Sequence, residues 1–84
     1  MEQDKYESEN NEVLNGVYAD AFRIGHSAYK FVLDFGQFTP DGGEKCFHTR
    51  VITDPDTAKV LVETVGRSIK DYENQFGRIP QSDE

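Results

Sequence analysis

TDPDTAKVLVETVGRSIKDYENQFG, residues 53–77, is the stretch that decides the fold of this chain. The spacing of its apolar residues predicts one amphipathic helix of about 22 residues, roughly 33 Å long. The apolar side chains recur in steps of four and three, at Ala58, Val62, Val65, Ile69, Tyr72 and Phe76, with Leu61 widening the stripe. Such a stripe is expected to be buried against another surface.

The ends of this helix carry residues that favour helix termini. Asp54 can accept a hydrogen bond from the first free amides, and Pro55 suits the first helical position. Gly77 can adopt the conformation that closes a helix, and Pro80 prevents a restart.

The sequence before the helix indicates three strands joined by short turns. We expect the strands at residues 16–24, 28–38 and 45–52, where large apolar residues alternate with small or polar ones, and turns at 25–27 and 39–44. The fold class is therefore α+β: a three-stranded antiparallel β-meander followed by one long C-terminal helix packed on a sheet face. The aromatic face of the sheet, with Tyr29, Phe31, Leu33 and Phe35, is expected to meet the helix.

Acidic charge is concentrated in the terminal segments. Residues 1–12 carry five carboxylates against one lysine, a net charge of −4, and residues 83–84 add −2, so the total of −7 leaves the middle nearly neutral. Segments of this composition rarely order themselves, so we expect a disordered arm at 1–14, a single domain at 15–79 and a disordered tail at 80–84. The acidic balance, without a clustered basic surface, argues against a nucleic-acid partner.

The chain has one cysteine, Cys46. It therefore has no intramolecular disulfide, and no Cys/His set has zinc-ligand spacing. A single thiol fits a reducing compartment, and we see neither a secretory leader nor an apolar run long enough to span a membrane, so we expect a cytoplasmic protein without a membrane partner. Oligomerisation is the remaining way to stabilise a domain of this size.

Two features favour self-association as a dimer or tetramer, with another protein as a further candidate partner. The sheet has two open edges, and its second face is more apolar than solvent requires, at Val17, Ala19, Ala21, Val32 and Cys46. The helical stripe also continues for about three heptads, with Gly66 midway, where glycine costs about 1 kcal/mol relative to alanine and often marks the close approach of another backbone. Alternatively, the stripe lies on its own sheet and Gly66 makes room for an aromatic ring.

Cys46, His48 and Arg50 are spaced to share one strand face. A thiolate stabilised by His48 or Arg50 is a candidate nucleophile, so a small enzyme or ligand-binding domain is the alternative function. No residue is obviously placed to orient the histidine, and a polar stripe paired with Asp20 or Asp34 is the commoner explanation. We therefore assign no catalytic residue, cofactor or metal site; His26 and His48 alone supply too few ligands.

Three blocks, FRIGHSAYKFVLDFGQ (22–37), FHTRVITDPDTAK (47–59) and IKDYENQFGRI (69–79), resemble a small prokaryotic family, domain of unknown function 3467. The resemblance implies a bacterial protein of uncharacterised function and carries no site residue over. At the level of architecture, a meander followed by a long helix is similar to the export chaperone SecB, which implies edge-to-edge pairing of subunits and binding of unfolded clients. This chain is shorter and has no fourth expected strand. The sequence thus favours a homo-oligomeric protein-binding or assembly module that is not an enzyme.

Overall fold

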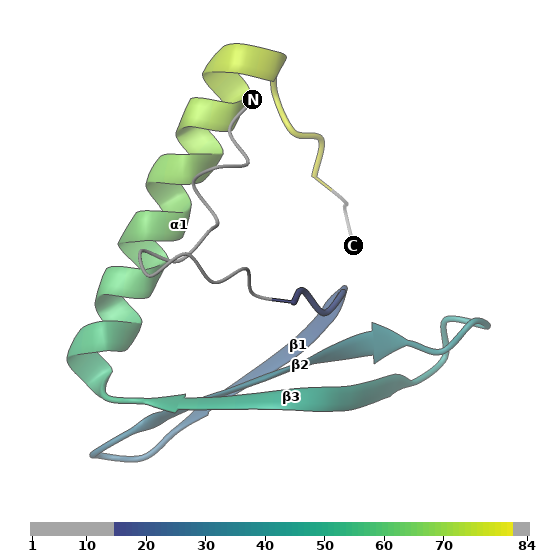
Figure 1. Cartoon of the computed structure of the whole chain (residues 1–84), viewed down its shortest axis with the longest axis vertical. Coiled ribbons are helices and arrows are strands. Elements are labelled where there is room, and N and C mark those ends of the chain that lie inside the picture. The colour runs from purple at the N-terminus through teal and green to yellow at the C-terminus, as the bar shows by residue number, and fades with distance from the viewer. Residues whose placement is uncertain (1–14, 82–84) are drawn as a thin grey trace.

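The computed structural model describes residues 15–81, which form a β-meander followed by one helix (Figure 1). The elements are β1 (Ala21–His26), β2 (Phe31–Phe38), β3 (Lys45–Thr53) and α1 (Pro55–Phe76). The three strands form one antiparallel sheet in the order β1-β2-β3, so the expected α+β fold class is confirmed. The expected disordered arm at 1–14 and residues 82–84 of the expected tail lie outside the described residues.

The first two strands begin later than predicted, whereas the third matches to within one residue. Residues 16–20 were expected in the first strand but have no regular structure, and β1 starts at Ala21. The first turn also lies further along the chain than residues 25–27, because the Ser27 amide donates to the Lys30 carbonyl at 2.9 Å. Gly25 consequently belongs to β1, where it lies opposite Val32.

The register gives the sheet two chemically different faces. On one face, Ile24 lies opposite Leu33, which in turn lies opposite Val51. On the other face, Arg23 lies opposite Asp34, which lies opposite Arg50. Because residues directly opposite each other in antiparallel strands point to the same side, one face is apolar and the other carries a row of charges.

A β-bulge interrupts β3 at His48. Phe35 lies opposite Thr49, but the next residue, Gly36, lies opposite Phe47, so His48 is the extra residue. Gly36 is required there, since a Cβ at this position would lie 2.6 Å from the Cα of Phe47. The bulge reverses the alternation of side chains along the N-terminal part of β3.

The helix begins and ends as predicted. The Asp54 side chain accepts a hydrogen bond from the Thr57 amide at 2.9 Å, and Pro55 is the first helical residue. At the other end, Gly77 has a φ of 103° and its amide donates to the Glu73 carbonyl at 2.9 Å. Both termini are thus determined by local capping interactions.

The helix packs on the sheet through its first two turns only. In Figure 1, α1 continues from the end of β3 and diverges from the sheet toward its C-terminus. Ala58 is the one buried residue of α1. Beside it, a hollow of about 450 Å³ lies between helix and sheet and is lined almost entirely by apolar side chains, those of Ile24, Phe31, Leu33, Pro55, Ala58, Leu61 and Val62 with Lys59 at its edge. Most of the stripe therefore lies beyond the reach of the sheet.

Candidate functional site

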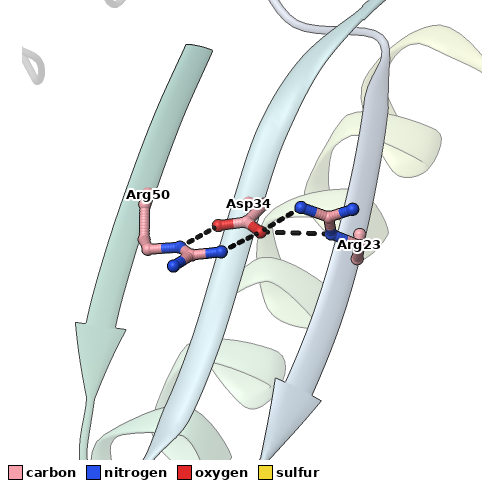
Figure 2. A network of polar contacts seen from close by, with 3 residues as sticks. All are labelled: Arg23, Asp34 and Arg50. Atoms are coloured by element: carbon pink, nitrogen blue, oxygen red, sulfur yellow. Dashed lines mark hydrogen bonds and ion pairs between the residues drawn. The ribbon is translucent and has the colours of Figure 1, made fainter. Parts of the chain in front are cut away.

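A buried carboxylate joins all three strands on the charged face of the sheet (Figure 2). Arg50 donates to Asp34 through Nε at 2.7 Å and through Nη2 at 2.9 Å. Arg23 donates from the opposite side through Nε at 3.2 Å and Nη2 at 3.0 Å. The Asp34 side chain is 5% exposed, whereas those of Arg23 and Arg50 are 59% and 60% exposed. We call these three residues the charge triad.

The electrostatics of the charge triad keep Asp34 ionised. The hydrogen bonds from Arg50, and then those from Arg23, hold the pKa of Asp34 well below its usual range, although burial opposes this shift. The same contact with Asp34 raises the pKa of Arg50. A guanidinium stays protonated at physiological pH, so none of the three can exchange protons as a general acid or base. The charge triad can therefore act only through electrostatic attraction and hydrogen bonding. These contacts hold β1 and β3 to β2.

Aromatic and imidazole side chains border the charge triad. The Arg23 guanidinium lies 4.2 Å from the ring centroid of Phe47, which the bulge places on this face. His48 makes hydrogen bonds through Nδ1 with Thr49 Oγ1 at 2.7 Å and through Nε2 with the Tyr18 carbonyl at 3.1 Å. Both ring nitrogens of His48 thus have partners in the described structure. His48 acts here as a structural group that fastens residues before β1 to the bulge.

Cys46, the candidate nucleophile, does not lie beside the charge triad. Cys46 lies opposite Gln37, on the far side of the bulge from Arg50, which lies opposite Asp34. Gln37 and Asp34 are separated by an odd number of positions on β2, so Cys46 and Arg50 fall on opposite faces of the sheet. The expected shared face of Cys46, His48 and Arg50 is therefore wrong, because the alternation assumed an unbulged strand. Cys46 is a free, exposed thiol.

The residues expected to form an apolar second face are also divided. Ala21 and Val32 lie on the face of the charge triad, with Ala21 buried opposite Gly36. Cys46 lies on the other face, and Val17 and Ala19 precede β1. Asp20, one of the two expected carboxylate partners, accepts a hydrogen bond from the Phe38 amide at 3.1 Å instead. The second face thus carries the charge triad at its centre, and these five residues do not form one apolar surface among the described strands.

The sequence predicts a pairing of Arg50 with Asp34, whereas the part of Arg23 in this cluster is seen only in the structure. The signal was present, because alternating charges stand on three neighbouring strands at Arg23, Asp34 and Arg50. Recognising this row of charges requires the register of both hairpins. The first turn, expected at residues 25–27, lies further along the chain, so that register is hidden in the sequence.

Many exposed apolar side chains lie on α1 and on the face of the sheet beneath it. Val62 is 70% exposed and Phe76 is 65% exposed, and the Tyr72 and Phe76 rings lie 5.0 Å apart at the open end of the helix. On the sheet, Phe22 and Ile24 are exposed on the same side as Leu33. This surface, rather than the charge triad, is the candidate functional site.

Residues 15–81 contain neither a cluster of metal ligands nor a helix that could span a membrane. No cluster of three or more His, Cys, Asp or Glu side chains is close enough there to hold a metal ion. The single helix of this region is not apolar enough over its length to cross a bilayer.

Comparison with known proteins places the chain in a family but attaches no activity to it. No curated protein and no solved structure matches the chain. The family model described as protein of unknown function, DUF3467, matches residues 2–81. Because the match covers nearly all of the 84 residues, the chain belongs to the DUF3467 family.

Proposed function

We propose that this protein is a homo-oligomeric assembly module, a dimer or tetramer in which subunits cover one another's apolar helix and sheet surfaces. The observation that carries the proposal is the exposure of the helical stripe. Five of its large side chains are at least 44% exposed in the single chain, namely Val62, Val65, Ile69, Tyr72 and Phe76. Contiguous apolar surface of this kind marks sites of association.

The small core of the single chain supports the same proposal. Among the described residues, the buried apolar side chains are Ala21, Leu33 and Ala58, and none of the large ones is fully buried. Each large apolar side chain that an interface removes from water contributes about 1.5–3 kcal/mol. Most of the stability of a helix in a protein comes from the packing of its apolar face, so the C-terminal turns of α1 need a packing partner. In a homo-oligomer, a second copy of the same chain is that packing partner.

The proposal has two finer parts. The exposed free thiol of Cys46 supports the expected cytoplasmic location, because such a thiol stays unpaired in a reducing compartment. Holding unfolded clients on the same apolar surfaces, as the SecB-like order of elements implied, remains a prediction. It is tested by adding stoichiometric amounts of the protein to an unrelated denatured protein and measuring aggregation, which should decrease.

The proposal is tested by the mass in solution, measured by light scattering across the micromolar range. Two valines of α1 provide a matched pair: Val65 lies on the stripe and is 47% exposed, and Val60 lies on the opposite side and is 56% exposed. We expect a defined oligomer for the wild type and for Val60→Asp, and a monomer for Val65→Asp. A wild-type monomer throughout the range, or oligomers of equal stability for both variants, would refute the proposal.

A further inference from the structure

We propose that the second copy of this chain pairs its α1 antiparallel to the first, with the two-fold axis passing close to residue 67. This arrangement rests on the self-association proposed above and specifies its geometry. Four independent features of α1 support it: the order of side-chain sizes along the stripe, the apolar hollow at its N-terminal end, the charges beside the stripe, and Gly66.

Side-chain size increases along the stripe from Ala58 to the aromatic Tyr72 and Phe76. In an antiparallel pair about residue 67, Ala58 meets the partner's Phe76, and Val62 meets the partner's Tyr72. Each layer then combines a small residue with a large one, which gives layers of similar volume. A parallel pair in register would instead stack alanine on alanine at one end and phenylalanine on phenylalanine at the other, which packs unevenly.

The antiparallel arrangement also brings an aromatic ring to the apolar hollow. Ala58 lies in the wall of that hollow, together with Phe31 and Leu33 of the sheet. The partner's Phe76 arrives beside Ala58, where the ring can fill space that residues 15–81 leave open. The same contact covers part of the apolar sheet face. A parallel pair would leave this hollow empty and place both Phe76 rings at the opposite end of the helix.

Lys59 and Glu73 flank the same side of the stripe, one residue after Ala58 and one after Tyr72. They are 14 residues apart in the helix. This separation is about 21 Å along the axis, so the two side chains cannot pair within one chain. In the antiparallel pair, Lys59 faces the partner's Glu73, and the contact occurs twice. Glu73 is half-buried, and its Oε2 accepts a hydrogen bond from the Ile79 amide at 2.9 Å, which orients the carboxylate.

Gly66 lies on that same flank, midway between Lys59 and Glu73. Apart from the adjoining helix backbone, a Cβ at Gly66 would have no atom of the described residues within 4 Å, so packing within residues 15–81 does not require glycine here. The expected alternative, that Gly66 makes room for an aromatic ring of its own sheet, therefore has no support. In the antiparallel pair, Gly66 meets the partner's Gly66 next to the axis, and the missing side chains let the two backbones approach.

The arrangement is tested by exchanging the charges beside the stripe. We expect Lys59→Glu and Glu73→Lys each to weaken the dimer about tenfold, and the double variant to regain most of the wild-type affinity, measured by sedimentation. Arg67→Glu makes the same charge change on the opposite side of α1 and should leave affinity unchanged. Because the two residues cannot meet within one chain, recovery in the double variant reports a contact between chains. A double variant as weak as the single ones would contradict this geometry.

Cross-linking gives an independent measure of orientation, in chains with Cys46→Ser. Ser68→Cys places two thiols next to the axis of the antiparallel pair, and a short bis-maleimide should join them. Val62→Cys places the thiols about 15 Å apart along the axis, beyond its reach, whereas a parallel pair would bring them together. Cross-linking of Val62→Cys but not Ser68→Cys, in a protein that is dimeric by mass, would overturn the antiparallel arrangement and leave the assembly function intact. A monomeric wild type would instead overturn both.

Discussion

Arg50 of β3 donates two hydrogen bonds to Asp34 of β2, at 2.7 and 2.9 Å, directly across the strand pair. Asp34 also receives two hydrogen bonds from Arg23 on the opposite strand, so one carboxylate joins every strand of the sheet. A shift of either hairpin by one residue would move an arginine to the apolar face. The charge triad therefore selects the register of a sheet that has few buried side chains to do so.

Asp34→Asn is expected to reduce the free energy of unfolding, because it leaves two guanidiniums facing each other without the carboxylate. The side chain keeps its shape, so the loss reports charge and hydrogen bonding rather than a cavity. Denaturant unfolding of wild type and variant measures it. Asp71→Asn makes the same charge change on the exposed surface of α1 and should have almost no effect. Equal unfolding curves for wild type and Asp34→Asn would show that the charge triad does not stabilise the sheet.

Stability is expected to fall in acid. Hydrogen bonds lower the pKa of Asp34, Asp41 and Asp54 in the folded chain, through Arg50, Thr39 and Thr57 respectively. A lowered folded pKa contributes stability that is complete above the unfolded pKa of about 3.9 and is lost as the pH falls toward the folded value. The free energy of unfolding, measured from pH 7 to pH 2, should thus be nearly constant above about pH 5 and decline below about pH 4. Asp34→Asn should flatten that decline.

The parts of the structure that were predictable from sequence depend on local interactions. Asp54, Pro55 and Gly77 act within one turn of their own positions, and the helix has the expected termini. The bulge at His48 depends on the approach of β3 to Gly36, twelve positions earlier in the chain, and alternation along one strand carries no sign of it. The divergence of α1 from the sheet was likewise hidden, because periodicity shows which side of a helix is apolar but not what covers it.

Gly36→Ala is expected to disrupt pairing of β2 with β3. Its Cβ would lie 2.6 Å from the Cα of Phe47, so the backbone of the bulge must move. A cost of about 3 kcal/mol is expected, at the upper end for overpacking. Gly25→Ala is the control, since a Cβ there meets nothing within 4 Å, and it should change stability by less than about 0.5 kcal/mol. Thermal unfolding followed by circular dichroism compares the stability of the two variants. A smaller loss of stability for Gly36→Ala than for Gly25→Ala would be inconsistent with the bulge.

Alkylation of Cys46 tests the enzymatic alternative directly. An activated nucleophile requires a nearby positive group that favours the thiolate, but the bulge places Cys46 and Arg50 on opposite faces of the sheet. We therefore expect iodoacetamide to react with Cys46 at neutral pH as fast as with a thiol in an unstructured peptide. Arg50→Ala and His48→Ala should leave that rate unchanged, with Lys70→Ala on α1 as a control for the loss of a positive charge elsewhere. A faster reaction in the wild type that slows in Arg50→Ala alone would show that guanidinium and thiolate do interact, and would revive a catalytic role for this strand.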